Sequence, residues 1–198
     1  YVCKAFLEAV RAQVGMIGTI AYQIGDTVIP AAHTTPGALE LQQLLAKMVT
    51  HGCATAVMEV SSHALSQGRV NSICFDVAVF TNLSRDHLDY HLNFKNYFNA
   101  KKKLFDFPSL KVAVINIDDA YGKKLKLSLV KNKKEVITYG IKQGDVRATQ
   151  IIYSDSSTSF KLHFKKEIYE VNIPLVGEFN VYNILAVVSA LIASGYPI

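Results

Sequence analysis

Three continuous apolar runs of strand length constrain the fold of this chain more than any other feature. They cover residues 54–60 (ATAVMEV), 76–82 (DVAVFTN) and 111–116 (KVAVIN). Runs of this kind are typical of central strands in a parallel sheet that helices cover on both faces. Helical patterns follow the second and third runs, at residues 94–107 and 118–131. The alternation predicts an α/β fold with a doubly wound, mostly parallel sheet.

A further helix is predicted over residues 33–52, ahead of the first run. Its apolar residues recur at helical spacing, and Gly52 can end it. Thr34 or Thr35 can cap its start, with Pro36 in the first turn.

The two ends of the chain have different patterns. Residues 1–12 predict the body of a helix whose beginning is missing, and residues 177–195 predict a second helix with Asn180 near its start. From about Arg147, short strands at hairpin spacing predict a small antiparallel sheet beside the main one, at residues 147–154, 159–164 and 168–173.

Composition and charge exclude several classes of protein. Half of the 198 residues are apolar and 19% are charged, as in a globular domain. No apolar run is long enough to span a membrane, and no segment has the order of a signal peptide. The net charge of +5 includes lysine clusters, which we interpret as solvated faces. The alternative is a field that attracts anions such as nucleotides, whereas no nucleic-acid-binding pattern accompanies the lysines. Three cysteines without CxxC spacing predict reduced thiols in a cytoplasmic protein.

Polar side chains follow two of the apolar runs, at the strand ends where open parallel sheets bind ligands. Glu59 ends the first run and Asn82 ends the second. Further polar groups come after Asn82, namely Ser84, Arg85, Asp86, His87, Asp89 and His91. A carboxylate and an imidazole suit a divalent cation, and Mg²⁺ prefers few protein ligands together with water and substrate phosphates. The pattern predicts a site for a metal and a nucleotide-like ligand, although the chain has no GxxxxGK[ST] phosphate loop.

Each of these residues also has a structural interpretation. Glu59 could be a buried carboxylate that caps the next helix, and His87 could be a hydrogen-bonded structural imidazole. Asp86 and Asp89 could cap a helix start. Two polar clusters at neighbouring strand ends favour the functional interpretation.

The chain resembles the central domain of the Mur ligases over essentially its whole length. The matching segments are, in order, TTPGALELQ, MEVSSHALSQGRV, VFTNLSRDHLDYH, NYFNAKKKLF, NIDDAYG and GEFNVYNILAV. The most specific of them is TNLSRDHLDYH. One departure is His33, where some relatives have Asn. The resemblance implies a fold like that of the P-loop nucleotide hydrolases.

The resemblance also implies an activity. Mur ligases join an amino acid to a UDP-muramoyl peptide in peptidoglycan synthesis: ATP phosphorylates the acceptor carboxylate, and the amine attacks the acyl phosphate. The likeness is to the members that add the third residue, meso-diaminopimelate or L-lysine, to UDP-MurNAc-L-Ala-D-Glu. Another member of the superfamily, such as a folylpolyglutamate synthetase, is the alternative.

The resemblance implies a domain organisation and partners as well. Residues 1–198 would be the central ATP-binding domain without the phosphate loop and without the flanking N- and C-terminal domains. This piece is expected to be inactive by itself. The expected partners of a monomeric enzyme are ATP, UDP-MurNAc-dipeptide and an amino acid, with no nucleic acid and no membrane insertion.

Roles for individual residues follow from their matches in the resembling motifs. Glu59 and His87 would hold Mg²⁺ against the nucleotide phosphates, and both would be catalytic. Five residues would bind the muramoyl peptide, and one of them is an arginine whose guanidinium suits an anion. They are Thr34, Thr35, Ser61, Gln67 and Arg69. The nucleotide-binding residues would be those that support the metal and those near the adenine: Asn82, Asp86, Asn180 and Asn183.

Lys101 is assigned the least usual role. In the family, the lysine at this position carries a carbamate, which converts a cation into an anion and supplies a ligand for a second Mg²⁺. Lys101 would therefore be both catalytic and a metal ligand. The structural alternative is a helix-surface lysine, which the neighbouring Lys102 and Lys103 favour.

Overall fold

The structure is a computed structural model that describes residues 1–10 and 13–196. Over this range the chain has an α/β fold with mixed sheets, as predicted. Residues 11 and 12, at the end of the predicted N-terminal helix, lie outside the described residues. The chain divides into two compact units: unit 1 consists of Tyr1–Ile73 and Leu88–Leu104, and unit 2 of Cys74–His87 and Phe105–Ile198.

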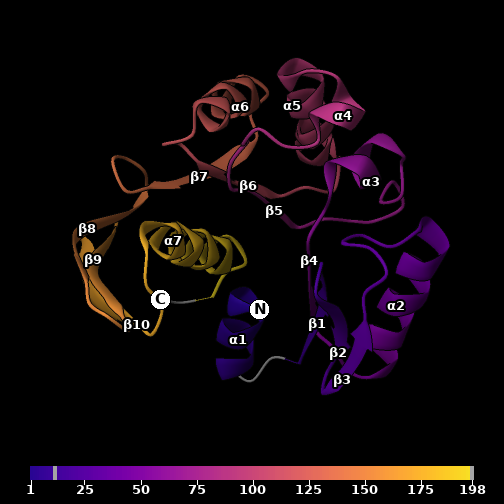
Figure 1. The fold of residues 1–198 in the computed structure, drawn as a ribbon, viewed down its shortest axis with the longest axis horizontal. Helices are drawn as coiled ribbons and strands as arrows, with labels where there is room; N and C mark the ends of the chain where they lie inside the picture. The colour runs from indigo at the N-terminus through magenta and orange to yellow at the C-terminus, as the bar shows by residue number, and fades with distance from the viewer. Residues whose placement is uncertain (11–12, 197–198) are drawn as a thin grey trace. The chain divides into compact units, whose positions relative to one another are not determined.

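Unit 1 contains a four-stranded sheet with the order β3–β2–β1–β4, in which β1 and β4 are parallel and the other pairs are antiparallel (Figure 1). The strands are β1 (Val14–Ile17), β2 (Ala21–Ile24), β3 (Thr27–Pro30) and β4 (Thr55–Met58). Helices α1 and α2 contact β1, while α3 and α4 contact α5. The helices are α1 (Val2–Ala9), α2 (Ala38–Thr50), α3 (Ser62–Ser66), α4 (Leu88–His91) and α5 (Phe94–Lys102), and a 3₁₀ turn follows at Lys103–Asp106.

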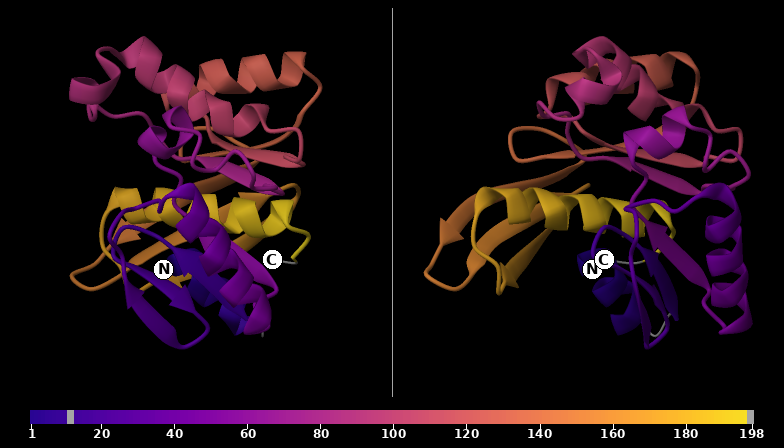
Figure 2. Two further views of the ribbon diagram at one scale, coloured as in Figure 1. Left: turned by 90° about the vertical axis from the view of Figure 1, so that its right-hand side faces the viewer. Right: turned by 45° about the vertical axis from the view of Figure 1, so that its right-hand side comes forward.

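Unit 2 contains a six-stranded sheet with the order β10–β9–β8–β7–β6–β5. Strands β5 to β8 are parallel, and β8 to β10 form the predicted antiparallel part. Helices α6 and α7 cover opposite faces of β6 and β7 (Figure 2). The elements are β5 (Val77–Phe80), β6 (Val112–Asn116), α6 (Ala120–Lys131), β7 (Glu135–Gly140), β8 (Val146–Tyr153), β9 (Thr158–Phe164), β10 (Glu167–Ile173) and α7 (Glu178–Ala193).

The three apolar runs do become strands, but only one of them is the buried central strand that their composition predicts. Strand β6 lies between β5 and β7, and all its residues are buried. Strands β4 and β5 are each the last strand of their sheet, and β4 is only half-buried. An apolar run shows that a strand forms, whereas its place in a sheet depends on pairing with residues far away in the sequence.

The predicted caps of α2 are wrong. The helix begins at Ala38 after Gly37, and no side chain caps it. The Thr35 hydroxyl instead donates to the carbonyl of Glu59, the residue that follows β4. The predicted end is confirmed, because Gly52 follows the helix with φ of 75°, a conformation that glycine adopts at little cost.

Candidate active site

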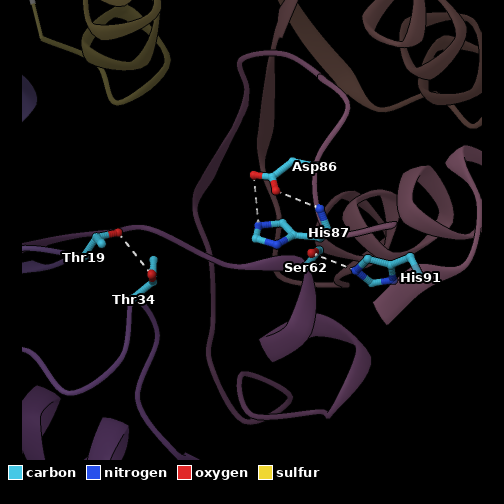
Figure 3. A network of polar contacts seen from close by, with 6 residues as sticks. All are labelled: Thr19, Thr34, Ser62, Asp86, His87 and His91. Atoms are coloured by element: carbon cyan, nitrogen blue, oxygen red, sulfur yellow. Dashed lines mark hydrogen bonds and ion pairs between the residues drawn. The ribbon is translucent and has the colours of Figure 1, made fainter. Parts of the chain in front are cut away.

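The carboxyl ends of β1 and β4 lie at the same edge of the unit 1 sheet, because the two strands are parallel. The backbone N–H of Glu59 donates to the carbonyl of Ile17 at 2.9 Å, which extends this pairing by one residue. The Thr19 hydroxyl donates to Glu59 Oε2 at 2.7 Å and lies 3.1 Å from the Thr34 hydroxyl (Figure 3). Glu59 is an exposed carboxylate, and Ser61, not Glu59, caps α3. The interpretation of Glu59 as a buried helix cap is therefore wrong.

Gly18 leaves room for the Glu59 carboxylate. A Cβ on Gly18 would lie 2.8 Å from Glu59 Oε1, so the carboxylate would have to move away from this position. Gly18 and Thr19 were not predicted as site residues from the sequence, since nothing in the pattern around them shows that β1 and β4 pair. The one available signal is the position of this Gly–Thr pair directly after an apolar strand.

Thr35 fixes the backbone that follows β4. Its side chain is 1% exposed, and its hydroxyl donates to the Glu59 carbonyl at 2.7 Å and accepts from the Ser61 N–H at 3.0 Å. The Arg69 guanidinium donates to the Thr35 carbonyl at 2.9 Å. Thr35 therefore holds Glu59 and Ser61 in place through their backbone.

Replacing Thr35 with valine is expected to lower the free energy of unfolding of this chain by about 1–3 kcal/mol, because valine leaves two partly buried backbone groups without a partner. Urea unfolding followed by circular dichroism measures the change. Thr50→Val is the matched control: the Thr50 hydroxyl donates to the Ala46 carbonyl on an exposed part of α2. Its loss should cost under about 0.5 kcal/mol. Equal losses for the two variants would contradict the assigned role of Thr35.

Arg69 is held in one orientation beside this loop. Its Nε donates to Gln67 Oε1 at 2.8 Å, and Gln67 Nε2 donates to the Tyr90 hydroxyl at 3.4 Å. Ser61 caps α3 by accepting from the Ala64 N–H at 3.2 Å. Hydrogen bonds thus connect six of the unit 1 residues predicted to bind the muramoyl peptide or Mg²⁺, namely Thr34, Thr35, Glu59, Ser61, Gln67 and Arg69.

Lys101 lies on α5 beside an aromatic cluster of unit 1. Its ammonium is 5.4 Å from the centre of the Tyr97 ring, and the His91 ring stacks on Tyr97 with 5.1 Å between centroids. His91 is buried, and its Nε2 lies 2.9 Å from the hydroxyl of Ser62 (Figure 3). Sequence analysis included His91 among the polar residues but did not find this contact. Lys101 is half-buried, whereas the neighbouring Lys103 is exposed.

The polar residues between Asn82 and His87, which follow β5, belong to unit 2. The His87 backbone N–H donates to Asp86 Oδ1 at 2.8 Å, and His87 Nε2 lies 3.4 Å from Asp86 Oδ2 (Figure 3). His87 has φ of 53°, the left-handed region that a residue with a Cβ rarely adopts. Backbone strain of this kind concentrates at functional sites. Asn82 is exposed at the start of the same segment.

The two asparagines assigned to the adenine lie in the first turns of α7, also in unit 2. Asn180 Nδ2 donates to the Val176 carbonyl at 3.0 Å, and Asn183 Nδ2 donates to Asn180 Oδ1 at 3.4 Å. Asn180 therefore stabilises the backbone just before α7 and orients the side chain of the exposed Asn183.

The carboxylate oxygens of Glu59 are suitable ligands for Mg²⁺, which prefers oxygen ligands and takes one or two of them from protein. Within residues 1–10 and 13–196, no group of three or more His, Cys, Asp or Glu side chains could hold a metal ion with protein ligands alone.

No helix in the same part of the chain is long and apolar enough to cross a bilayer.

Comparison with known proteins identifies the family. The sequence profile of the Mur ligase middle domain matches residues 1–191. The chain belongs to the Mur ligase family. It is 45% identical over 199 residues to the UDP-N-acetylmuramoyl-L-alanyl-D-glutamate–2,6-diaminopimelate ligase of Caldanaerobacter subterraneus subsp. tengcongensis, an alignment that covers 100% of this chain and 40% of that protein. The chain thus spans about 40% of the length of the curated relatives it matches.

Solved structures agree with this assignment. A structure of a UDP-N-acetylmuramoyl-L-alanyl-D-glutamate–2,6-diaminopimelate ligase matches with a TM-score of 0.91 at 35% identity and covers 99% of this chain and 40% of that chain. The MurF ligase from Thermotoga maritima in complex with ADP matches with a TM-score of 0.71 at 16% identity, covering 100% of this chain and 42% of that chain. The second likeness concerns the fold alone.

Proposed function

We propose that residues 1–198 are the central ATP-binding domain of a longer ligase that joins 2,6-diaminopimelate to UDP-MurNAc-L-Ala-D-Glu in peptidoglycan synthesis. The observation that carries the proposal is the hydrogen-bonded network around Glu59, Thr35 and Arg69 at the edge of the unit 1 sheet. The relative at 45% identity, named for this reaction, supports diaminopimelate over L-lysine. We call this longer protein the complete ligase.

The chemistry proceeds in two balanced steps. An oxygen of the acceptor carboxylate bonds to the γ-phosphorus of ATP, and ADP leaves with the electrons of the broken P–O bond. The amine of the amino acid then attacks the carbonyl carbon of the acyl phosphate, loses a proton and expels inorganic phosphate. Both steps depend on positioning and charge neutralisation more than on covalent help from the protein.

The residues of unit 1 have roles on the acceptor side. Arg69, which Gln67 and the Thr35 carbonyl hold in place, presents a guanidinium to an anionic part of the muramoyl peptide. The hydroxyls of Thr34 and Ser61 add hydrogen-bonding groups beside it. These contacts would fix the acceptor carboxylate in line with the γ-phosphate.

Magnesium ions would neutralise charge on the phosphates during the transfer. We assign Glu59 and His87 as ligands of Mg²⁺ and a carbamate on Lys101 as a ligand of a second Mg²⁺. Thr19 orients the Glu59 carboxylate, and Asp86 orients His87 through both its backbone and its ring.

The remaining assignments concern the nucleotide and the cellular setting. Asn180 and Asn183 would contact the adenine, and Asn82 and Asp86 would support the metal and nucleotide site. The MurF structure in complex with ADP supports a nucleotide on this fold. We further assign the enzyme to the cytoplasm, because the three cysteines of this chain are free thiols and the proposed substrates are nucleotides and a nucleotide-linked peptide. We also propose that it is a monomer.

The test of this function is acceptor-dependent ADP formation by the complete ligase. We expect ADP, phosphate and a UDP-MurNAc-tripeptide to form in equal amounts when ATP, Mg²⁺, UDP-MurNAc-L-Ala-D-Glu and meso-diaminopimelate are all present. Mass spectrometry identifies the product. A preference for L-lysine would correct the amino acid alone, whereas activity with a folate and glutamate in place of the muramoyl peptide would overturn the proposed function.

A further inference from the structure

Asp118 joins three parts of unit 2 through one carboxylate oxygen. Its Oδ2 accepts from the backbone N–H groups of Ile141 and Lys142 at 2.7 and 3.0 Å and from the Tyr182 hydroxyl at 2.9 Å. Asp118 follows β6, the two amides follow β7, and Tyr182 lies on α7. The carboxyl ends of β6 and β7 form the edge of the parallel sheet where nucleotides bind in folds of this kind.

Neighbouring groups pack closely around the Asp118 carboxylate. A Cβ on Gly140 would lie 2.8 Å from Asp118 Oδ2 and 2.5 Å from the Gln143 carbonyl oxygen, so only glycine fits there. Asp118 Oδ1 is buried and has no hydrogen-bond partner among the described residues. A buried acceptor without a donor costs free energy, which indicates that the carboxylate is held here for the contacts of its other oxygen.

The Tyr182 hydroxyl is not needed to pack α7 on the sheet. The helix already buries Val181 and Leu185 completely, together with Ile184. Tyr182 is half-buried, and its burial together with the Asp118 carboxylate raises its pKa. The hydroxyl therefore stays protonated at neutral pH and donates to Asp118.

The position of Tyr182 on α7 connects this bond to the nucleotide. Tyr182 lies between Asn180 and Asn183, which are three residues apart, share one side of the helix and hydrogen-bond to each other. The bond from the Tyr182 hydroxyl to Asp118 ties the first turns of α7 to the ends of β6 and β7, which limits the movement of both carboxamides.

We propose that Tyr182 and Asp118 form a positioning pair that aims Asn180 and Asn183 at the adenine of ATP. This inference rests on the proposed function and adds a specificity device to it. Without the tyrosine hydroxyl, α7 stays packed, but its first turns are no longer tied to the ends of β6 and β7. The loss should appear in recognition of the purine and not in the chemistry of ligation.

The experiment compares Tyr182→Phe with the wild type in the complete ligase. We expect the KM for ATP to rise roughly tenfold, with kcat and the KM for diaminopimelate within about twofold of the wild type. The preference for ATP over GTP, as the ratio of their kcat/KM values, should fall by a similar factor. Asp118→Ala should raise the KM for ATP at least as much, because it removes the acceptor of the Tyr182 hydroxyl together with that of two backbone N–H groups. Adding Tyr182→Phe to Asp118→Ala should raise the KM little further, because the hydroxyl has then already lost its partner.

Tyr139→Phe is the matched control. Tyr139 is a buried tyrosine of the same sheet whose hydroxyl donates to the Phe80 carbonyl at 3.3 Å instead of to Asp118. It should leave the KM for ATP and the ATP-to-GTP preference unchanged. If Tyr182→Phe leaves both quantities within about twofold in an active ligase, the positioning role is wrong. A wild-type protein that forms no ADP with the muramoyl acceptor would instead overturn the proposed function.

Discussion

Replacing Lys101 with alanine in the complete ligase is expected to reduce ligation by roughly 100-fold or more, the scale of losing a group that stabilises charge in phosphoryl transfer. The neutral Lys101 amine would attack the carbon of CO₂, form an N–C bond and release one proton, which leaves an anionic carbamate. The lysine nitrogen lies 5.4 Å from the centre of the Tyr97 ring. A cation beside the carbamate, as a bound Mg²⁺ would be, would stabilise its negative charge.

Further variants separate the charge of Lys101 from its bulk. Lys101→Arg should remain inactive because it restores only positive charge, whereas small carboxylic acids such as acetate should partly rescue Lys101→Ala by supplying an anion. Lys103→Ala, at an exposed lysine of the next turn, should stay within about twofold of the wild type. Initial rates of ADP formation measure all of these. Full activity of Lys101→Arg would refute the carbamate and leave Lys101 as a surface lysine.

Replacing Glu59 with glutamine should have an effect of similar size, roughly 100-fold in kcat, together with a higher Mg²⁺ requirement. The substitution keeps the shape of the side chain and an oxygen for the Thr19 hydroxyl, which donates to the carboxylate at 2.7 Å, but it removes the charge. A Mg²⁺ titration of ADP formation measures the requirement. Glu40→Gln, at an exposed carboxylate in the first turn of α2, is the control and should change neither quantity.

The same titration tests His87. His87→Ala should also abolish most Mg²⁺-dependent turnover, and it removes the ring that lies 3.4 Å from Asp86 Oδ2. Because His87 has a positive φ, the circular dichroism spectrum of the variant is compared with that of the wild type to show that the fold is retained. Unchanged Mg²⁺ dependence in both Glu59→Gln and His87→Ala would mean that neither residue is a metal ligand.

The fold class could be predicted because it depends on patterns that are local in the sequence. The apolar runs became strands, the helical patterns became helices, and polar residues such as Glu59 and Asn82 do follow strands. Gly52 ended α2 as expected, since a left-handed residue after a helix favours glycine. The family resemblance, carried by the motifs, was confirmed by the profile that matches residues 1–191.

The features that could not be predicted depend on contacts between distant parts of the chain. Pairing of β4 with β1 puts β4 at the edge of its sheet and brings Gly18 and Thr19 to Glu59. The Thr35 hydroxyl donates to the Glu59 carbonyl after β4 and therefore does not cap the start of α2, where local rules predicted a cap. The bond between Asp118 and Tyr182 spans 64 residues, and no local pattern indicates it.

Phosphorylation of the acceptor carboxylate before the amide bond forms is the central step of the proposed reaction, and an isotope experiment tests it directly. UDP-MurNAc-L-Ala-D-Glu with oxygen-18 in both D-glutamate carboxylates is converted by the complete ligase with ATP and meso-diaminopimelate, and the released phosphate is analysed by mass spectrometry. If the acceptor carboxylate is phosphorylated before the amine attacks, each turnover transfers one labelled oxygen to inorganic phosphate. Tripeptide formation with unlabelled phosphate would contradict the acyl-phosphate mechanism proposed for this domain.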